Sequence, residues 1–531
     1  MKLFSKFLRF LQRHQCLTAV ASGILFSLPF AFPPLFLLSI LGSALFVIAL
    51  YGDASLLKQK IKKPFLRGFL FGLGFFIPLY HWFIALYPFN GFDFTPAQSI
   101  FIIIAACVGI SIIHSLYYAL TIQLYALLRP SPAFVPLLLS AFWVLTEWAM
   151  SLGELGFSWG ITAISQLWLL PSVQTASVFG SYFITLVIIS SGACIGLALI
   201  YRDKAKKFLS AAAVIYIANF VLGTVLYFIP TPTNGTVDSV ILQANISSSE
   251  KWENEGKASV DAYFSLLDEA VKSYDADIIV MPESAFPFNY TSNSALKEKL
   301  QQISTQENVI ILLGALTKTE DDVYNSLVAI YPDGSDSNIY NKRSLAPFGE
   351  FMPYKNFFES TFPFIKDLNL SSSEISFGEG SNLLESRFGK LGGLICFDSI
   401  FPDNARMSVK DGANLLVLAT NDSWYKDTAG VRQHADFARL RAIENGRDVV
   451  RSANTGISMF IDSKGRVIKS LPALEMGIVE SKVKTSDHLA LYTIFGDTAL
   501  YFSFTIIVFG VIKRVYGLII VRKNKKSGEF I

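Results

Sequence analysis

The stretch Leu391-Gly392-Gly393-Leu394-Ile395-Cys396-Phe397-Asp398 places a thiol at the end of a short apolar run. A run of this length that ends in polar residues is typical of a buried strand. Two other apolar runs end in a reactive side chain: Ile278–Glu283 ends in a carboxylate, and Ile339–Arg343 carries the ammonium group of Lys342. Function in open α/β sheets tends to lie where strands end, so these three strand ends are the candidate site.

The segment around these runs, residues 237–486, has 250 residues, which is enough for one large domain. Short apolar runs alternate there with amphipathic stretches, so we expect an α/β fold with a buried sheet. The expected strands are 237–246, 277–282, 308–315, 326–331, 338–343, 390–397, 414–419 and 449–453, with a hairpin across 462–465. The expected helices are 255–274, 294–306, 401–411 and 431–446.

Cys396 is the only cysteine of this segment, because Cys16, Cys107 and Cys194 fall in apolar stretches elsewhere. A lone cysteine is either a buried, inert side chain or a reactive thiol. No second cysteine or close histidine pair accompanies it, so we expect no metal site and no cofactor. A thiol needs a base or a cation to become a good nucleophile at neutral pH, and the other two strand ends supply one of each.

Charge divides the chain into three parts. Residues 1–236 hold 14 Lys or Arg and 5 Asp or Glu, residues 237–490 hold 25 and 35, and residues 491–531 hold 6 and 2. The first part is as poor in charge as a membrane protein, and the acidic middle part argues against nucleic acid as a partner. We therefore expect membrane helices in 1–236, a catalytic domain in 237–486, and a last membrane helix with a basic tail in 487–531.

The apolar stretches are long enough for about eight membrane spans, since a span needs roughly 20 mostly apolar residues. The first two are the least secure, because only Phe30–Pro34 separates them, and they could form one re-entrant pair. The candidates are 16–32, 34–51, 65–88, 97–128, 133–150, 172–201, 209–229 and 490–512.

Lys and Arg alternate between the short loops. The N-terminus, the 52–64 loop, the 202–208 loop and the tail are basic, whereas the loops 89–96 and 151–171 have no Lys or Arg. Basic loops stay in the cytoplasm, so both termini should be cytoplasmic and the large domain should lie outside, which in a bacterium is the periplasmic side of the inner membrane.

The three strand ends resemble the Glu-Lys-Cys triad of the nitrilase superfamily, and the whole chain resembles the apolipoprotein N-acyltransferases of that superfamily. The motifs that carry the resemblance are Met281-Pro282-Glu283-Ser284, Tyr340-Asn341-Lys342-Arg343, Pro347-Phe348-Gly349-Glu350-Phe351-Met352-Pro353, Ile395-Cys396, Asn421-Asp422-Ser423-Trp424, Arg441–Arg447 and Asn454–Ser458. One of them alone is a weak signal, but all of them occur in order beside the expected spans.

The resemblance implies an αββα sandwich and a ping-pong acyl transfer from a phospholipid to the N-terminal amine of a diacylated apolipoprotein. Glu283 would be the general base, Lys342 would stabilise the tetrahedral intermediate and Cys396 would carry the acyl thioester. Glu350 would support the site. Four further residues match positions at the pocket or the membrane face: Gln243, Trp252, Trp424 and Trp159.

The chain departs from the family directly after the nucleophile, where Tyr and Glu are usual and Phe397 and Asp398 stand here. The ring and the charge are kept, so both residues should still support the site, but any role of the tyrosine hydroxyl in acyl-donor binding is in doubt. A membrane-anchored amidase or nitrilase-type hydrolase is the alternative function. Eight spans argue against it, because a small soluble amide does not need them.

Several other residues have less specific expectations. We expect His434 at the surface or at a helix end, and Glu147 exposed at the membrane interface. The charged residues of helix 431–446 either bind lipid headgroups or form a solvated, salt-bridged face. The aromatic stretch Phe348–Phe364 is either core or a lipid-facing arm.

Overall fold

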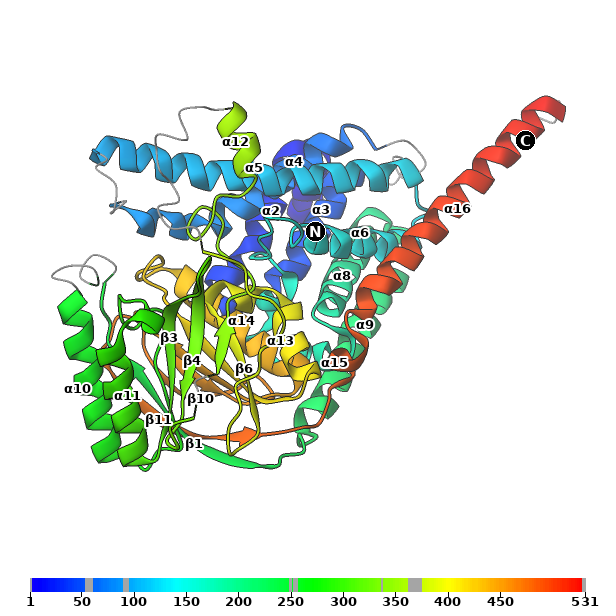
Figure 1. The fold of residues 1–531 in the computed structure, drawn as a ribbon. Coiled ribbons are helices and arrows are strands. Elements are labelled where there is room, and N and C mark those ends of the chain that lie inside the picture. The colour runs from blue at the N-terminus through cyan, green and yellow to red at the C-terminus, as the bar shows by residue number, and fades with distance from the viewer. Residues whose placement is uncertain are drawn as a thin grey trace.

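The computed structural model describes residues 2–52, 61–88, 95–247, 251, 256–335, 338–361 and 375–527. Two β-sheets lie at the centre of one half of the molecule, and a group of apolar helices forms the other half (Figure 1). The labels below follow Figure 1.

The first sheet has the order β11-β1-β2-β3-β4-β5. Strands β1, β2 and β3 are parallel, and the other pairs are antiparallel. Parallel strands are usually buried on both faces and read as continuous apolar runs, which is how β2 and β3 read. The bounds are β1 Gly235–Gln243, β2 Ile278–Val280, β3 Ile310–Lys318, β4 Val323–Ile330, β5 Ile339–Asn341 and β11 Gly477–Thr485.

The second sheet has the order β10-β9-β8-β7-β6, in which β6, β7 and β8 are parallel. The expected hairpin across 462–465 joins its antiparallel strands β9 and β10. The bounds are β6 Lys390–Ile395, β7 Ala413–Thr420, β8 Val449–Ala453, β9 Ser458–Ile461 and β10 Val467–Leu471.

Helices cover the outer face of each sheet. One apolar cluster fills the space between the two sheets. A second cluster joins the first sheet to α10 (Lys257–Ser273) and α11 (Ser294–Glu307). A third joins the second sheet to α13 (Pro402–Lys410) and α14 (Ala429–Asn445). The order of layers is therefore αββα, as predicted.

The apolar helices pack into one bundle above the second sheet (Figure 1). Small residues allow close helix crossings: a Cβ on Gly23 would lie 2.2 Å from the carbonyl oxygen of Phe71, and one on Gly74 would lie 2.3 Å from that of Val20. The bounds are α1 Lys2–Arg13, α2 Gln15–Ala31, α3 Leu38–Tyr51, α4 Pro64–Leu79, α5 Pro96–Leu128, α6 Val135–Ala149, α7 Ala176–Phe179, α8 Tyr182–Ile200, α9 Ala205–Phe228, α15 Leu491–Phe495 and α16 Thr498–Ser527.

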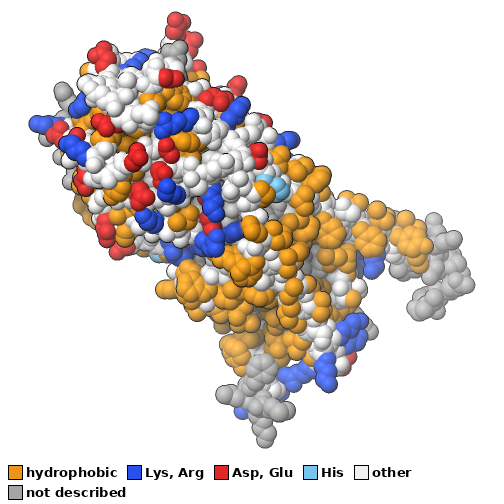
Figure 2. Space-filling model, turned by 90° about the horizontal axis from the view of Figure 1, so that it is seen from below, with side chains coloured by type: hydrophobic (Ala, Val, Ile, Leu, Met, Phe, Trp, Pro, Cys, Tyr) orange, Lys and Arg blue, Asp and Glu red, His pale blue; other side chains and the backbone are white. Residues whose placement is uncertain are grey.

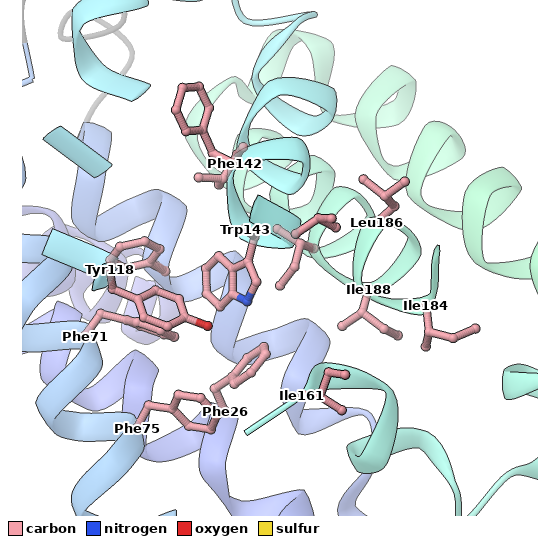
Figure 3. Packing of buried hydrophobic residues seen from close by; sticks show 14 of the residues in the cluster. Phe26, Phe71, Phe75, Tyr118, Phe142, Trp143, Ile161, Ile184, Leu186 and Ile188 are labelled. Carbon is pink, nitrogen blue, oxygen red and sulfur yellow. The ribbon is translucent and has the colours of Figure 1, made fainter. Parts of the chain in front are cut away.

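Aromatic rings fill the centre of this bundle. Trp143 of α6 is 1% exposed, and its ring centroid lies 5.3 Å from Phe26, 5.0 Å from Phe71 and 5.0 Å from Tyr118 (Figure 3). The largest apolar cluster of the described residues continues from the bundle into α14, so the helical bundle and the α/β domain share one core. Outside this core, hydrophobic side chains cover the surface of the bundle, and charged side chains are spread over the domain (Figure 2).

Four helices of the described part are long and apolar enough to cross a membrane: α5, α8, α9 with the short turn before it, and α16. The pair α1 and α2, which is bent by 106°, makes a fifth if it counts as one span. Helices α3, α4 and α6 occupy the other expected segments but are shorter. The count of eight spans thus stays a prediction.

Candidate active site

Glu283 follows β2, and its side chain is buried at the candidate site. Its Oε1 accepts hydrogen bonds from Asn325 Nδ2 at 2.7 Å and from Lys342 Nζ at 3.1 Å. Its Oε2 accepts the backbone N–H of Asn421 at 2.9 Å. The carboxylate is therefore fixed by groups from both sheets, and its orientation toward the site does not depend on solvent.

Lys342 follows β5 and is 2% exposed. Its Nζ lies 3.1 Å from Glu283 Oε1 and 2.8 Å from Glu350 Oε2. Glu350 is held in turn by the backbone N–H of Ala346 at 2.8 Å and by Asn325 Nδ2 at 2.8 Å. The structure thus brings the predicted supporting carboxylate to the ammonium group of Lys342.

Asn325 of β4 was not predicted as a site residue, although it donates to both carboxylates. Its signal in the sequence was weak, because a polar residue inside an apolar strand is also typical of a buried structural hydrogen bond. Only the folded sheet shows that the side chain of Asn325 faces the site.

Cys396 lies at the sharp turn between β6 and the 3₁₀ helix η10 (Cys396–Ile400). Its φ is +46°, in the left-handed region that residues with a Cβ rarely adopt. Such strain persists only where the surroundings hold it, and it is concentrated at functional sites. The thiol is free.

The three groups act on one another electrostatically. Burial raises the pKa of the Cys396 thiol, the Glu283 carboxylate raises it further, and Lys342 opposes both. Burial alone would raise the pKa of Glu283, but the charge of Lys342 and the bond from Asn325 hold it below its ordinary value. Burial would lower the pKa of Lys342, yet Glu283 and Glu350 raise it well above its ordinary value. At neutral pH the site therefore holds a thiol, a carboxylate and an ammonium group.

Asp398 supports the turn that carries the nucleophile. Its Oδ2 accepts from Tyr340 Oη at 2.8 Å and from the N–H of Ile395 at 3.0 Å, and its Oδ1 accepts from the N–H of Ser344 at 2.7 Å. These donors belong to β6 and to the chain on either side of Lys342, so this carboxylate ties the thiol's turn to the lysine's strand. Burial raises the pKa of Asp398.

Phe397, the other replacement after the nucleophile, is buried against the helical bundle. Its ring stacks on Phe157 with centroids 5.8 Å apart and meets Phe401 edge-on at 5.3 Å. The ring of Phe397, which lacks the hydroxyl group of the usual tyrosine, therefore packs against aromatic neighbours.

The four pocket positions carried over from the resemblance lie in different surroundings. Gln243 is buried and bonds to Pro472, Glu475 and Ser458, so it holds the chain between β10 and β11. Trp424 is 51% exposed. Trp159 is buried against α14, and Trp252 lies outside the described residues.

Lys251, next to Trp252, is a buried cation that the sequence did not single out. Burial lowers its pKa to about 8, while the charge of Glu283 opposes that shift. It is a second ammonium group whose field reaches the candidate base.

The expected surface position of His434 was wrong. This residue of α14 is 0% exposed, and its Nδ1 lies 2.7 Å from Asp422 Oδ1. A polar face with residues three and four apart is typical of a solvent-exposed helix face, but the same pattern occurs on a face that another layer of the protein covers. Helix α14 is covered in this way, because it lies between the sheet and the helical bundle (Figure 1).

Two more expectations of exposed charges are wrong. Arg441 and Glu444 of α14 are 0% exposed and form an ion pair with 3.0 Å between Nε and Oε2, so neither is solvated or free for a lipid headgroup. Glu147 is buried as well: its carboxylate accepts the N–H of Thr162 at 3.0 Å and the hydroxyl of Thr185 at 2.7 Å. A charged residue near the end of an apolar helix is typical of the membrane interface, but this carboxylate binds the first N–H of the 3₁₀ helix η4 (Thr162–Gln166).

The aromatic stretch after Lys342 is divided between core and surface. Phe351 is buried, whereas Phe348, Tyr354 and Phe357 are exposed, the last on α12 (Lys355–Thr361). The part of the stretch beyond Thr361 lies outside the described residues. A cleft of about 610 Å³ lies beside it, between the domain and α6 and α16; its lining includes Phe351, Phe377, Phe397, Trp148, Leu500 and Phe504.

Within the described ranges, no three His, Cys, Asp or Glu side chains are grouped so that they could hold a metal ion.

Comparison with known proteins gives two family matches along the chain. Residues 241–488 match the carbon-nitrogen hydrolase family, and residues 22–194 match the apolipoprotein N-acyltransferase N-terminal domain. The two matched regions correspond to the α/β domain and to most of the helical bundle.

Two relatives with the same name match most of the chain. The apolipoprotein N-acyltransferase of Shewanella oneidensis is 30% identical over 377 residues, which cover 68% of this chain and 71% of the relative. That of Photobacterium profundum is 28% identical over 499 residues and covers 92% of each chain. Among solved structures, Nit3 of Saccharomyces cerevisiae, a nitrilase-superfamily protein, is 19% identical, with a TM-score of 0.37 over 48% of this chain and 93% of its own.

Proposed function

The chain belongs to the apolipoprotein N-acyltransferase family and is an acyltransferase, and from this we propose that it moves an acyl chain from a phospholipid to the N-terminal amine of a diacylglyceryl-cysteine lipoprotein. In this proposal Cys396 carries the chain as a thioester. The observation that supports it most is the meeting of a half-buried thiol, an ionised Glu283 and a charged Lys342 at three strand ends.

The first half of the reaction forms the thioester. Glu283 accepts the thiol proton as the sulfur attacks the ester carbonyl carbon of the phospholipid. The carbonyl oxygen becomes an oxyanion, which the ammonium group of Lys342 stabilises. When the intermediate collapses, the C–O bond to the glycerol breaks, and the leaving oxygen takes the proton from Glu283 to give a lysophospholipid.

The second half transfers the chain to nitrogen. The acceptor's amine attacks the thioester carbonyl, Glu283 takes a proton from the nitrogen, and the C–S bond breaks. The sulfur recovers its proton from Glu283, so the site returns to its starting state with an amide as product. No cofactor takes part in these steps.

Glu350 and Asn325 have a positioning role in this proposal. Lys342 pairs with two carboxylates. When its ammonium group turns toward an oxyanion, it can therefore keep a contact with at least one of them. Asn325 joins the two carboxylates through one amide group, which keeps them at a fixed separation on either side of the ammonium group.

We also propose the membrane arrangement. Residues 1–236 and 487–531 would form eight spans, with both termini in the cytoplasm, and residues 237–486 would lie on the periplasmic side of a bacterial inner membrane. Exposed Phe348, Tyr354, Phe357 and Trp424 would face the lipid near the acyl-chain entrance. An opening toward the bilayer would keep water from the thioester until the acceptor arrives.

Purified enzyme mixed with phospholipid, but without a lipoprotein, tests the proposal. One acyl chain should accumulate on Cys396, with about one equivalent of lysophospholipid released, as a ping-pong reaction requires. A diacylated lipopeptide with a free α-amine should then discharge the chain onto nitrogen. Both products are measured by mass spectrometry.

The matched control compares Cys396→Ser with Cys194→Ser, which changes a buried cysteine of α8. Only the first should abolish the acyl-enzyme. The hydrolase alternative predicts something else: continuous release of free fatty acid, with no stable acyl-enzyme and no transfer to the lipopeptide. That outcome would overturn the transferase mechanism.

A further inference from the structure

The backbone carbonyl of Cys396 is held from behind by a buried histidine. His434 Nε2 lies 3.2 Å from this carbonyl oxygen, and the hydroxyl of Ser399 donates to the same oxygen at 2.8 Å. These two contacts therefore fix the peptide that follows the nucleophile.

The imidazole is itself fixed by charged neighbours. Its Nδ1 lies 2.7 Å from Asp422 Oδ1, and the other oxygen of Asp422 accepts from Arg451 Nη2 at 2.7 Å. Burial opposes ionisation of Asp422, but Arg451 and His434 hold its pKa well below the ordinary value. A ring nitrogen that carries a hydrogen donates it: from Nδ1 to this carboxylate, and from Nε2 to the carbonyl of Cys396 or to the hydroxyl of Ser399, which lies 3.3 Å away.

This support matters because the nucleophile's backbone is strained. A φ of +46° is costly for a residue with a Cβ and is kept only where neighbours determine it. The carbonyl of Cys396 and the N–H of Phe397 belong to one planar peptide, so a bond that holds the carbonyl also fixes the direction of that N–H. The direction of the thiol depends on the same backbone angles.

The helical bundle supplies the next contact. The indole of Trp159, in the chain between α6 and η4, stacks on His434 with centroids 5.7 Å apart and an angle of 19°. Its Nε1 donates to Gln433 Oε1 at 2.7 Å, which fixes the ring against the first turns of α14. Phe157 stacks on Trp159 at 5.4 Å and on Phe397 at 5.8 Å. Rings that precede η4 thus pack on His434, which contacts the Cys396 carbonyl, and on Phe397, which follows it.

We propose that His434 and Trp159 are positioning residues for Cys396, so that the helical bundle, through Trp159, holds the imidazole that holds the nucleophile. The inference rests on the proposed function, in which Cys396 carries the acyl chain. Asp422 and Arg451 complete the arrangement from the side of the catalytic domain. The bundle would then contribute to the chemistry and not only to the membrane location of the domain.

The test measures Cys396 in two ways in the full-length enzyme: its rate of acylation across phospholipid concentrations, and its alkylation by iodoacetamide without lipid, followed at the Cys396 peptide by mass spectrometry. The variants are His434→Gln, Trp159→Leu and the double variant. Trp143→Leu is the matched control, because Trp143 is equally buried and its ring packs on Phe26 and Tyr118 of the bundle (Figure 3).

Each single variant should lower the maximal acylation rate by up to about 10²-fold, the loss expected when a reacting group is displaced by an ångström or less. The phospholipid concentration at half-maximal rate should change by less than about twofold, and alkylation of Cys396 should slow as well. The double variant should be about as slow as His434→Gln alone, because residues that act through one contact are not additive. Trp143→Leu should lower the melting temperature but keep the rate per folded molecule.

A wild-type acylation rate in Trp159→Leu, or losses that multiply in the double variant, would overturn the inference. If His434→Gln does not fold, Trp159→Phe provides the second comparison, since it keeps a stacking ring and should lose less rate than Trp159→Leu. If the wild-type enzyme forms no acyl-enzyme, the proposed function fails instead. The alkylation rates then still decide whether these residues position the thiol.

Discussion

Lys342 lies between two carboxylates, and this arrangement separates its role from that of an ordinary ion pair. One acid would be enough to neutralise a buried ammonium group, yet Glu283 and Glu350 both lie within 3.1 Å of its Nζ. A spare partner lets the ammonium group turn toward a new negative charge at small cost. Replacing it by arginine keeps the charge but places the donors in a planar fork.

We therefore expect Lys342→Arg to lose about 10²–10³ in the rate of Cys396 acylation, the usual cost of losing one oxyanion donor. The rate is measured by mass spectrometry of the acyl-enzyme in single-turnover experiments. Lys390→Arg is the control, because Lys390 forms an exposed pair with Glu385 and should tolerate the change. Near-normal turnover in Lys342→Arg would make this residue structural.

The pH dependence of acylation tests the base. Glu283 is held below its ordinary pKa, so it stays a carboxylate through the neutral range and loses that form only as the pH falls through its lowered pKa. The wild-type rate should thus be flat above about pH 5, given an ordinary glutamate pKa of about 4.3, and should fall at lower pH.

Glu283→Gln removes the proton acceptor while the thiol keeps a pKa raised by burial. Only the small thiolate fraction can then react, so the rate should rise about tenfold per pH unit from about pH 6 to 8. Asp268→Asn, at an exposed carboxylate of α10, should keep the flat profile. A flat profile in Glu283→Gln would show that another group takes the thiol proton.

At the scale of elements, β3 holds the base in place through a glycine. A Cβ on Gly314 would lie 2.5 Å from the Cα of Glu283 and 2.5 Å from the carbonyl oxygen of Pro282. Both are backbone atoms, so the clash cannot be relieved by turning a side chain. Strand β3 must therefore have no side chain at position 314 if Glu283 is to keep its hydrogen bonds.

Gly314→Ala should therefore displace the chain at Glu283, cost about 1–3 kcal/mol of stability as overpacked cores do, and lower the acylation rate. Thermal unfolding and single-turnover acylation measure the two effects. Gly235→Ala in β1 is the control, because the nearest atom to its added Cβ is 3.9 Å away. A variant with normal acylation would show that Glu283 tolerates movement of its strand.

The sequence predicted these elements well where apolar runs were short and ended in polar residues. The strands β1 to β8 and the helices α10, α11, α13 and α14 all lie within a few residues of the expected ranges. Strand β11 was missed, because its Glu480, Lys482 and Lys484 break the apolar pattern at a sheet edge, where only one side needs to be covered.

The candidate site was predicted less completely. The ends of three strands pointed to the thiol, carboxylate and ammonium group, but nothing local in the sequence places Asn325 or His434 beside them. Their positions depend on which faces of the strands and helices are covered by the second sheet and by the bundle. The packing of the layers determines this, and the spacing of residues in the sequence does not reveal it. The same reason explains why Glu147 and Arg441 were expected to be exposed.

For the whole molecule, the number of helices that cross the membrane determines on which side each loop lies. Counting only the four long apolar helices, or all eight expected segments, puts the catalytic domain and the C-terminus on opposite sides. A reporter near Gly235 should need export and one after Lys526 should work only in the cytoplasm in either case. Lys and Arg side chains gather at the end of the bundle farthest from the domain, as cytoplasmic loops would (Figure 2).

The turn between α5 and α6 distinguishes the two counts. With eight spans Ser131 lies in the cytoplasm, whereas with four it lies on the same side as the catalytic domain. We expect Ser131→Cys, made in a chain whose exposed Cys16 is replaced by serine, to resist a membrane-impermeant maleimide in spheroplasts and to react once the membrane is opened. Ser335→Cys, exposed on the domain, is the control and should react at once. Immediate labelling at Ser131 would favour four spans, and the short helices α3, α4 and α6 would then pack within the bundle without crossing the bilayer.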